Sequence, residues 1–133
     1  MIAPAIRARL EDLFRDLFDP NTPAERLTRH LTDDYRQDVD GRTLDLSGFV
    51  AHARALKSTL AEAAVSFETV IGDERRAASL HVVSGRKLDG TTVRVRVYAF
   101  FEFADGRVRR VDEVTRLLEG EEDDRDLGSR TAD

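Results

Sequence analysis

The sequence predicts an α+β domain in which N-terminal helices pack in the concave face of a curved antiparallel sheet, giving a cone-shaped barrel. Apolar residues recur at helical spacing in the first half of the chain, whereas the second half alternates apolar and polar residues with a period of two. Helices followed by a meander of strands favour the α+β class over a doubly wound sheet. A sheet that curls around its helices would enclose a pocket.

Three helices are expected before residue 61. The first ends at Asp19-Pro20, because the residue before a proline resists the helical conformation. Residues 22–25, with the sequence TPAE, place a capping threonine before a proline and predict the start of a second helix. After a short strand over residues 35–39, Asp45 is the expected N-cap of the third helix.

Four longer strands follow, separated by Gly-Asp or Asp-Gly turns; they are expected over residues 65–71, 78–88, 92–103 and 107–118. The last two strands form a hairpin around Ala104-Asp105-Gly106, which reads as either a two-residue or a three-residue loop. These registers place opposite faces of the last strand against the apolar face of its neighbour. We expect the three-residue loop, which sets Glu113 beside Val97 and turns its side chain inward.

Charge divides the chain into a domain and a tail. Residues 119–133 contain seven acids and two arginines, which equals the net charge of −5 for the whole chain. This segment is poor in apolar residues, so we expect a domain over residues 1–118 and an acidic, disordered tail over residues 119–133. A neutral body with an acidic tail gives no electrostatic reason to bind nucleic acid, and contact through outward arginines is the weakest hypothesis.

Other function classes are disfavoured by what the sequence lacks. There is no cysteine, which excludes disulfides, thiolate nucleophiles and cysteine-ligated zinc. No apolar run approaches the length of a membrane span or resembles a secretory signal, so a cytoplasmic protein without membrane contact is the expectation. The three histidines lack metal-ligand spacing, and His30 and His81 are expected on exposed or interface faces. We expect no metal and no cofactor.

Two stretches of the chain resemble the SnoaL-like branch of the nuclear-transport-factor-two-like superfamily. They are LTDDYRQDVDG leading into a helix with FVAHARAL, and the hairpin YAFFEFADGRVRRVDEVTRLLEG. That branch includes polyketide cyclases, ketosteroid isomerases and limonene epoxide hydrolases. The resemblance covers about residues 5–118 and implies a curved sheet around an apolar pocket, commonly with dimerisation through the sheet. It does not specify the chemistry, because the scaffold hosts enzymes and binding proteins alike.

The catalytic groups of these relatives are matched only in part. Where ketosteroid isomerases use a tyrosine and two aspartates, the chain offers Phe14, Val39 and Ala99. The limonene epoxide hydrolase pattern is approached by Tyr35-x-Gln37 and Glu113, but the inward Arg-x-Asp is missing. The resemblance therefore implies neither of those two reactions. SnoaL-type cyclases use an acidic base in the pocket, which Glu113 would imitate.

Glu113 and His52 are the candidate catalytic residues. An inward carboxylate must find a cation, find hydrogen-bond donors or keep its proton, since leaving it charged and unpaired costs several kcal/mol. Arg86 is the candidate cation, and a Glu113–Arg86 pair would be structural, whereas an unpaired Glu113 would be poised as a general acid or base. His52 interrupts the apolar stripe of the third helix and would relay a proton or orient a ligand oxygen; a hydrogen-bonded core histidine is the alternative.

The expected pocket binds a small, largely apolar organic ligand. Besides the two candidate catalytic residues, its lining is expected to include Tyr35, Gln37, Phe49, Leu56, Val82, Ser84, Arg86, Val97, Phe101 and Thr115. The sequence supports a proton-transfer enzyme of the isomerase, cyclase or dehydratase type, with Gln37 orienting an oxygen. The alternative is a non-catalytic ligand-binding or dimeric interaction domain. The outer sheet face, with Tyr98, Phe100 and Val114, predicts a homodimer.

Overall fold

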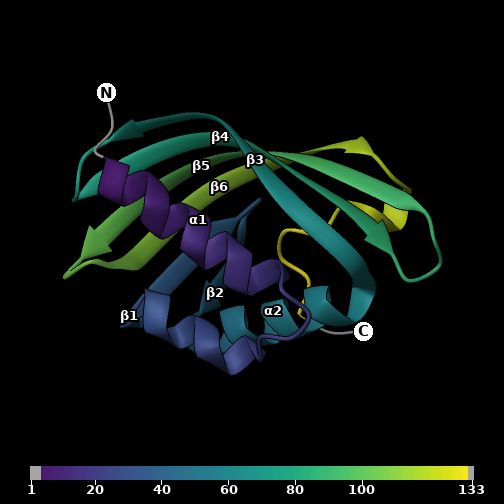
Figure 1. Ribbon diagram of the computed structural model, residues 1–133, viewed down its shortest axis with the longest axis horizontal. Coiled ribbons are helices and arrows are strands. Elements are labelled where there is room, and N and C mark those ends of the chain that lie inside the picture. Colours follow the sequence, from purple (N-terminus) through teal and green to yellow (C-terminus); the bar gives the residue numbers. More distant parts are fainter. Residues whose placement is uncertain (1–3, 132–133) are drawn as a thin grey trace.

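A computed structural model describes residues 4–131 as one curved, six-stranded sheet that arches over the helices (Figure 1). The helical elements are α1 (Pro4–Phe18), the 3-10 helix η1 (Ala24–His30), α2 (Leu46–Thr59) and the 3-10 helix η2 (Glu122–Asp124). The strands are β1 (Leu31–Val39), β2 (Arg42–Asp45), β3 (Leu60–Gly72), β4 (Arg76–Lys87), β5 (Thr92–Ala104) and β6 (Arg107–Glu119). The predicted α+β class and the concave packing of the helices are confirmed.

The sheet has the order β2-β1-β6-β5-β4-β3. Neighbouring strands are antiparallel except for β1 and β6, which run parallel, so the sheet is mixed. Register shifts interrupt the β1–β6, β3–β4 and β5–β6 pairs, and such bulges bend strands and increase their twist. The resulting curvature leaves room for α1 and α2 on one side. No described helix is long and apolar enough to cross a membrane.

Helix α1 packs its apolar stripe against the concave face of the sheet. Its inward residues Ile6, Leu10, Leu13 and Leu17 are 0–6% exposed, and the helix ends before the predicted break at Asp19-Pro20. On β5 the alternate residues from Val93 to Phe103 are buried, as the period-two pattern predicts. Helix and sheet thus meet through the two apolar faces that the sequence pattern defines.

Two local predictions in the first half of the chain need correction. The expected second helix is the 3-10 helix η1, and Thr22 is not its cap, because the Thr22 hydroxyl donates to Asp19 Oδ2 at 3.0 Å. Strand β2, which pairs with β1 before α2 begins, was not predicted. The N-cap of α2 is confirmed, since Asp45 Oδ1 accepts a hydrogen bond from the backbone N–H of Gly48 at 2.8 Å.

The β5–β6 hairpin has a two-residue turn rather than the predicted three-residue loop. Asp105 and Gly106 both have positive φ, 52° and 79°, and Ala104 pairs directly with Arg107. A two-residue turn alone would turn Glu113 outward. The register shift after Val108, which leaves Arg109 without a partner on β5, exchanges the faces again and sets Glu113 beside Ala99. The inward orientation of Glu113 was therefore predicted correctly, but its expected partner on β5 was wrong.

The face of β4 that points into the pocket is not the one that was predicted. His81 pairs with Val97, so the odd-numbered residues of β4 face the concave side. Val82 pairs with Arg96 on the convex side, and Ser84 and Arg86 are exposed. Of the two alternatives that the sequence left open for Glu113, the pair with Arg86 is absent, because Arg86 Nε lies 3.2 Å from the carboxylate of Glu62 on β3. These three residues do not line the pocket.

The C-terminal segment, here residues 121–131, folds back over the concave side instead of forming the expected solvated tail (Figure 1). The chain reverses at Gly120, where a Cβ would meet Asp124 Oδ2 at 2.9 Å and where φ is +148°. Asp124 and Leu127 are only 2% and 3% exposed. Lys87 Nζ donates to both carboxylate oxygens of Asp124, at 3.1 and 3.2 Å, which neutralises the buried acid.

Candidate functional site

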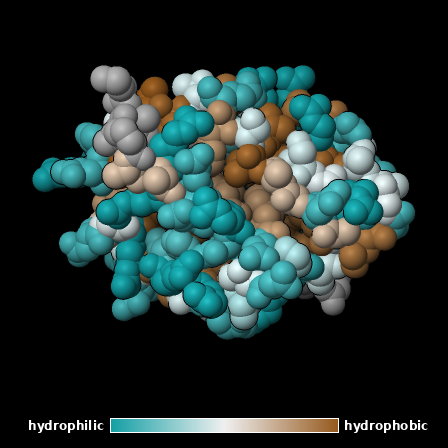
Figure 2. Space-filling view, in the orientation of Figure 1, coloured by the Kyte–Doolittle hydropathy of each residue, from teal (hydrophilic) through white to brown (hydrophobic). Residues whose placement is uncertain are grey.

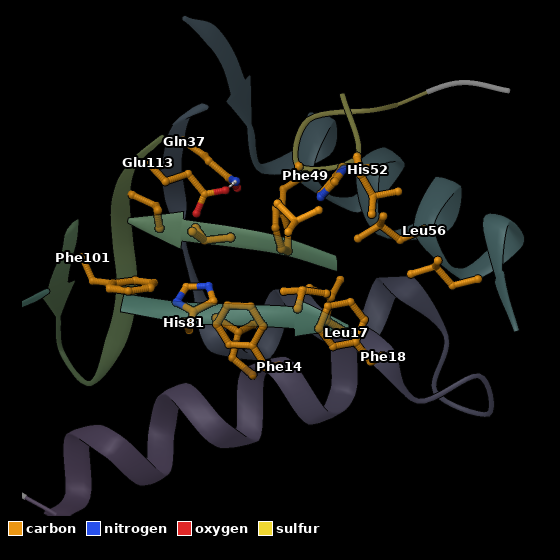
Figure 3. Close-up of a pocket in the computed structure, with 18 of the residues that line it drawn as sticks. Phe14, Leu17, Phe18, Gln37, Phe49, His52, Leu56, His81, Phe101 and Glu113 are labelled. Atoms are coloured by element: carbon orange, nitrogen blue, oxygen red, sulfur yellow. Dashed lines mark hydrogen bonds between the residues drawn. The ribbon is translucent and has the colours of Figure 1, made fainter. Parts of the chain in front are cut away.

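A cavity of about 70 Å³ lies between α1, α2 and the sheet (Figure 3). Its lining comprises Leu13, Phe14, Leu17, Phe18, Tyr35, Gln37, Phe49, His52, Leu56, Leu60, His81, Val83, Val95, Val97, Phe101, Val111, Glu113, Leu127 and Gly128. Figure 2 shows a hollow of apolar colouring in the face that carries α1, rimmed by hydrophilic side chains. The cavity is smaller than the roughly 300–1,000 Å³ of typical ligand sites, so it fits a small molecule or a ligand that displaces part of a wall.

Most of the predicted lining residues meet in this cavity. Tyr35, Gln37, Phe49, His52, Leu56, Val97, Phe101 and Glu113 all line it. Thr115 does not, because its backbone N–H and its hydroxyl both donate to the carboxylate of Asp40. Val82, Ser84 and Arg86 are excluded by the face that β4 presents, as described above.

Glu113 brings the carboxyl group that distinguishes this cavity from an apolar core. It lies on β6 between Val39 of β1 and Ala99 of β5, and the residue as a whole is half-buried. Its carboxyl Oε1 accepts one long hydrogen bond, from Gln37 Nε2 at 3.4 Å. Burial raises the pKa of Glu113 to about 8; the nearby charge of Asp40 adds to this rise, and the Gln37 hydrogen bond opposes it.

No cation compensates this carboxyl group. Within residues 4–131, no Lys or Arg lies within 4.0 Å of it, and none lines the cavity. Glu113 therefore holds its proton at neutral pH. Because Gln37 donates to Oε1, the proton belongs on Oε2, where it can be donated into the cavity.

Tyr35 and Gln37 fix the position of the carboxyl group from β1. Both side chains are almost fully buried, at 3% and 4% exposure. The Tyr35 hydroxyl donates to Gln37 Oε1 at 2.7 Å, so the Gln37 amide can turn only its Nε2 toward Glu113. Burial, together with the Glu113 carboxyl, raises the pKa of Tyr35 well above its ordinary value. Tyr35 is thus a neutral donor, and the three residues form one hydrogen-bonded chain.

His52 enters the cavity from α2. Its Nδ1 lies 2.7 Å from the backbone carbonyl oxygen of Arg130, and a carbonyl can only accept, so Nδ1 carries a hydrogen. Burial lowers the pKa of His52 to about 4, and the charges of Arg42 and Arg130 lower it further, while the Arg130 carbonyl opposes them. The ring is therefore neutral at pH 7, and its Nε2 has a free lone pair.

His81 is a lining residue that sequence reasoning missed. It lies on β4, is 1% exposed and has Nδ1 2.7 Å from the Ser79 hydroxyl. Its ring packs edge-on against Phe14, with 5.0 Å between the centroids. Burial lowers the pKa of His81 to about 4, so this ring is also neutral. The expectation that His81 is exposed or at an interface was wrong, because the β4–β5 register pairs it with the inward Val97 and apolar periodicity does not fix that register.

The site therefore combines an apolar, aromatic wall with four ionisable groups, Tyr35, His52, His81 and Glu113, that are all uncharged near neutral pH. Glu113 can donate a proton, and His52 can accept one. No three metal-ligating side chains come together within residues 4–131. The arrangement is suited to moving a proton to or from an uncharged organic molecule rather than to holding an anion.

Comparisons with known proteins agree with this architecture. The family model of the SnoaL-like domain matches residues 10–111. An uncharacterised protein of Schizosaccharomyces pombe is 39% identical over 120 residues, covering 90% of this chain and 92% of the relative.

Solved structures share the fold at low sequence identity. An NTF2-like protein of unknown function from Exiguobacterium is 16% identical with a TM-score of 0.68, covering 83% of this chain and 97% of its own. A protein from Rhodopseudomonas palustris described as a candidate isomerase is 20% identical with a TM-score of 0.70, covering 86% and 91%. AclR from Streptomyces galilaeus, described as a candidate hydroxylase, is 14% identical with a TM-score of 0.69, covering 84% and 74%. At these identities the likeness shows the fold alone.

Proposed function

This chain belongs to the SnoaL-like domain family, and from that premise we propose that it is an acid–base enzyme of the isomerase or cyclase type. Its substrate is a small, uncharged and largely apolar organic molecule with a carbonyl or hydroxyl oxygen. One observation carries the proposal: Glu113 places a carboxyl group without a cation in an apolar cavity. Such a group is neutral at pH 7 and close to the pKa at which proton transfer is efficient.

In the proposed reaction Glu113 gives a proton to the substrate and His52 takes one from it. Glu113 Oε2 donates its proton to a substrate oxygen, and Gln37 holds the carboxyl in place through Oε1. His52 Nε2 accepts a proton from the carbon adjacent to the carbonyl carbon, which converts a ketone to its enol. When His52 returns its proton to the same or another carbon and Glu113 takes back the enol proton, both residues regain their starting states and the substrate is exchanged or its double bond is shifted. Phe49, Phe101 and Leu56 hold the apolar body of the substrate.

Hydrogen–deuterium exchange at carbon tests this function without knowledge of the natural substrate. The protein is incubated in D₂O with 2-tetralone or cyclohex-3-en-1-one, and loss of the proton signal next to the carbonyl is followed by NMR. We expect exchange above the buffer rate with the native chain and a return to the buffer rate with Glu113→Gln. Glu62→Gln, on the exposed side of β3, is the matched control and should exchange like the native protein.

An equal exchange rate in Glu113→Gln and the native chain would remove Glu113 from the mechanism. Folding of the variant is checked separately by its circular dichroism spectrum. Native mass spectrometry of the purified chain identifies any molecule that copurifies, and a bound molecule without exchange activity would favour the alternative of a non-catalytic ligand-binding domain.

The convex face of the sheet supports a second part of the proposal, a homodimer. Tyr98 and Val114 are directly paired across β5 and β6 and are 43% and 61% exposed, and Phe100 beside them is 44% exposed. Large apolar side chains grouped on one face mark a surface that is covered in the assembled protein. The concave face is already filled by α1 and α2, so a second copy of this chain would pack on the convex side.

A further inference from the structure

The cavity has one wall that does not belong to the sheet or to α1 and α2. The C-terminal segment, residues 121–131, crosses the concave side and contributes Leu127 and Gly128 to the lining. Leu127 is 3% exposed and belongs to the core cluster of the domain. A Cβ on Gly128 would lie 3.1 Å from Thr115 Cγ2 and 3.9 Å from Glu113 Oε1, so this backbone lies directly beside the candidate carboxyl group.

Specific contacts attach the segment at both ends. Near its start, Asp124 is held by Lys87, as described above. Near its end, Arg42 Nη1 donates to the carbonyl oxygen of Ser129 at 2.8 Å, and Arg42 Nη2 donates to Thr131 Oγ1 at 2.6 Å. The Arg130 side chain bends back onto the segment and bonds the carboxylate of Asp126. The Arg130 side chain is therefore engaged within the segment while its backbone carbonyl faces His52.

We propose that the C-terminal segment is a working part of the site, because the carbonyl of Arg130 fixes the His52 ring in the Nδ1–H tautomer and leaves its Nε2 lone pair facing the cavity. The carbonyl oxygen lies 2.7 Å from Nδ1. Nε2 makes no hydrogen bond to any of residues 4–131, although the ring lines the cavity (Figure 3). The partner of one ring nitrogen decides which nitrogen can accept a proton.

This inference makes Arg130 a positioning residue through its main chain, not through its charge. Without the segment, the Nδ1–H would face solvent and either nitrogen of the ring could carry the hydrogen. The low pKa of His52 supports the assignment, because only a neutral ring has tautomers. The use of His52 in turnover rests on the proposed function, whereas the tautomer itself does not.

The test measures the tautomer directly, by two-bond proton–nitrogen correlation spectra of the full, nitrogen-15-labelled chain at pH 7. His52→Gln assigns the His52 signals by their disappearance. Gly128→Val places a branched side chain where even its Cβ would lie 3.1 Å from Thr115 Cγ2 and 3.4 Å from Val39 Cγ1, which crowds the segment against these side chains. Arg42→Met removes both hydrogen bonds that hold the end of the segment. The matched control is Arg36→Met, because Arg36 is an exposed arginine of β1 whose side chain bonds only Asp38 among residues 4–131.

We expect the Nδ1–H pattern for His52 in the native chain and in Arg36→Met. In Gly128→Val and Arg42→Met that pattern should be lost in favour of the Nε2–H form or an exchange average. If Gly128→Val does not fold, Arg42→Met decides alone. An Nε2–H or doubly protonated His52 in the native chain overturns the inference, as does an unchanged Nδ1–H pattern in the variants that fold. The carbon-exchange assay tests the proposed enzymatic function, and the His52 spectra test the role of the C-terminal segment. Either measurement can give a negative result without the other, so the two proposals are distinguishable.

Discussion

Replacement of Glu113 by Gln should change how the stability of the protein depends on pH. The unfolded glutamate releases its proton near pH 4.5, and the buried one near pH 8. Between these values the native state holds one more proton than the unfolded state, so raising the pH favours unfolding. One proton corresponds to about 1.4 kcal/mol per pH unit. The glutamine side chain of the variant does not titrate, so the free energy of unfolding of Glu113→Gln does not fall with rising pH for this reason.

The expected magnitude follows from the two pKa values. From pH 5.5 to pH 8.5, ionisation of Glu113 should cost the native chain about 3 kcal/mol of its free energy of unfolding relative to Glu113→Gln. Groups that titrate in both chains contribute equally to both free energies of unfolding, so subtracting one from the other at each pH isolates the contribution of Glu113. Urea denaturation at pH 5.5, 6.5, 7.5 and 8.5 measures it, with the midpoint and slope fitted at each pH.

The two buried histidines impose the opposite trend at lower pH. Each takes up a proton near pH 6.5 when unfolded but only near pH 4 in the native state. The unfolded state then binds more protons as the pH falls from 6.5 to 4, so stability declines in that direction. Glu113 opposes this trend from about pH 4.5 upward, but the two histidines together outweigh it below pH 6.5. The native chain should therefore be most stable near pH 6.5. Parallel stability curves for the native chain and Glu113→Gln would show that Glu113 ionises at an ordinary pH and would refute the argument.

Two further variants test the hydrogen-bonded chain and the convex face. Tyr35→Phe should lower the free energy of unfolding by about 1–3 kcal/mol in urea denaturation, because the buried Gln37 Oε1 loses its donor; an unchanged midpoint would mean that this bond contributes nothing. Val114→Glu should convert the proposed dimer to a monomer in sedimentation velocity, since two like charges would face each other across the interface. Leu88→Glu, 70% exposed at the β4–β5 hairpin, is the matched control and should remain dimeric; a monomeric native chain contradicts the proposal.

The parts of the fold that follow from local periodicity could be predicted from the sequence. The stripe of α1, the Asp45 cap and the alternation of β5 each depend on neighbours within a few residues. The inward side chain of Glu113 was predictable for a related reason. A buried apolar set fixes which face of the strand is inside, although it does not fix which residue lies opposite. The actual pairing came from a two-residue turn combined with a bulge at Arg109.

The orientation of β4 could not be obtained in the same way. Ala77, Ala78, Leu80, Val82 and Val83 make both faces of this strand apolar, so periodicity gives no preference between them. The face is set by the connection to β5, where Arg86 pairs with Thr92 and the loop is centred on Asp89. A shift of one residue in that loop exchanges the two faces. The register that this loop sets places His81 in the cavity and Arg86 on the convex side, the reverse of the prediction.

The C-terminal segment shows a limit of composition as evidence. Its density of acids predicts a solvated chain, because unpaired charges resist burial. Here the charges are compensated individually: Lys87 pairs with Asp124, and Arg130 pairs with Asp126. A single apolar residue, Leu127, then anchors the segment in the core. Composition averages over these contacts and so cannot anticipate them.

The choice of glutamate at position 113 argues for a chemical role over a structural one. A glutamine there would have nearly the same shape and could accept the same hydrogen bond from Gln37, without a group that ionises as the pH rises. The carboxyl group instead makes the protein less stable above neutral pH, and no cation within the described residues offsets that cost. Residues that lower stability without a packing benefit are found where function requires them. The property that distinguishes Glu113 from glutamine is a proton that it can give up near pH 8, which is the property that the proposed reaction uses.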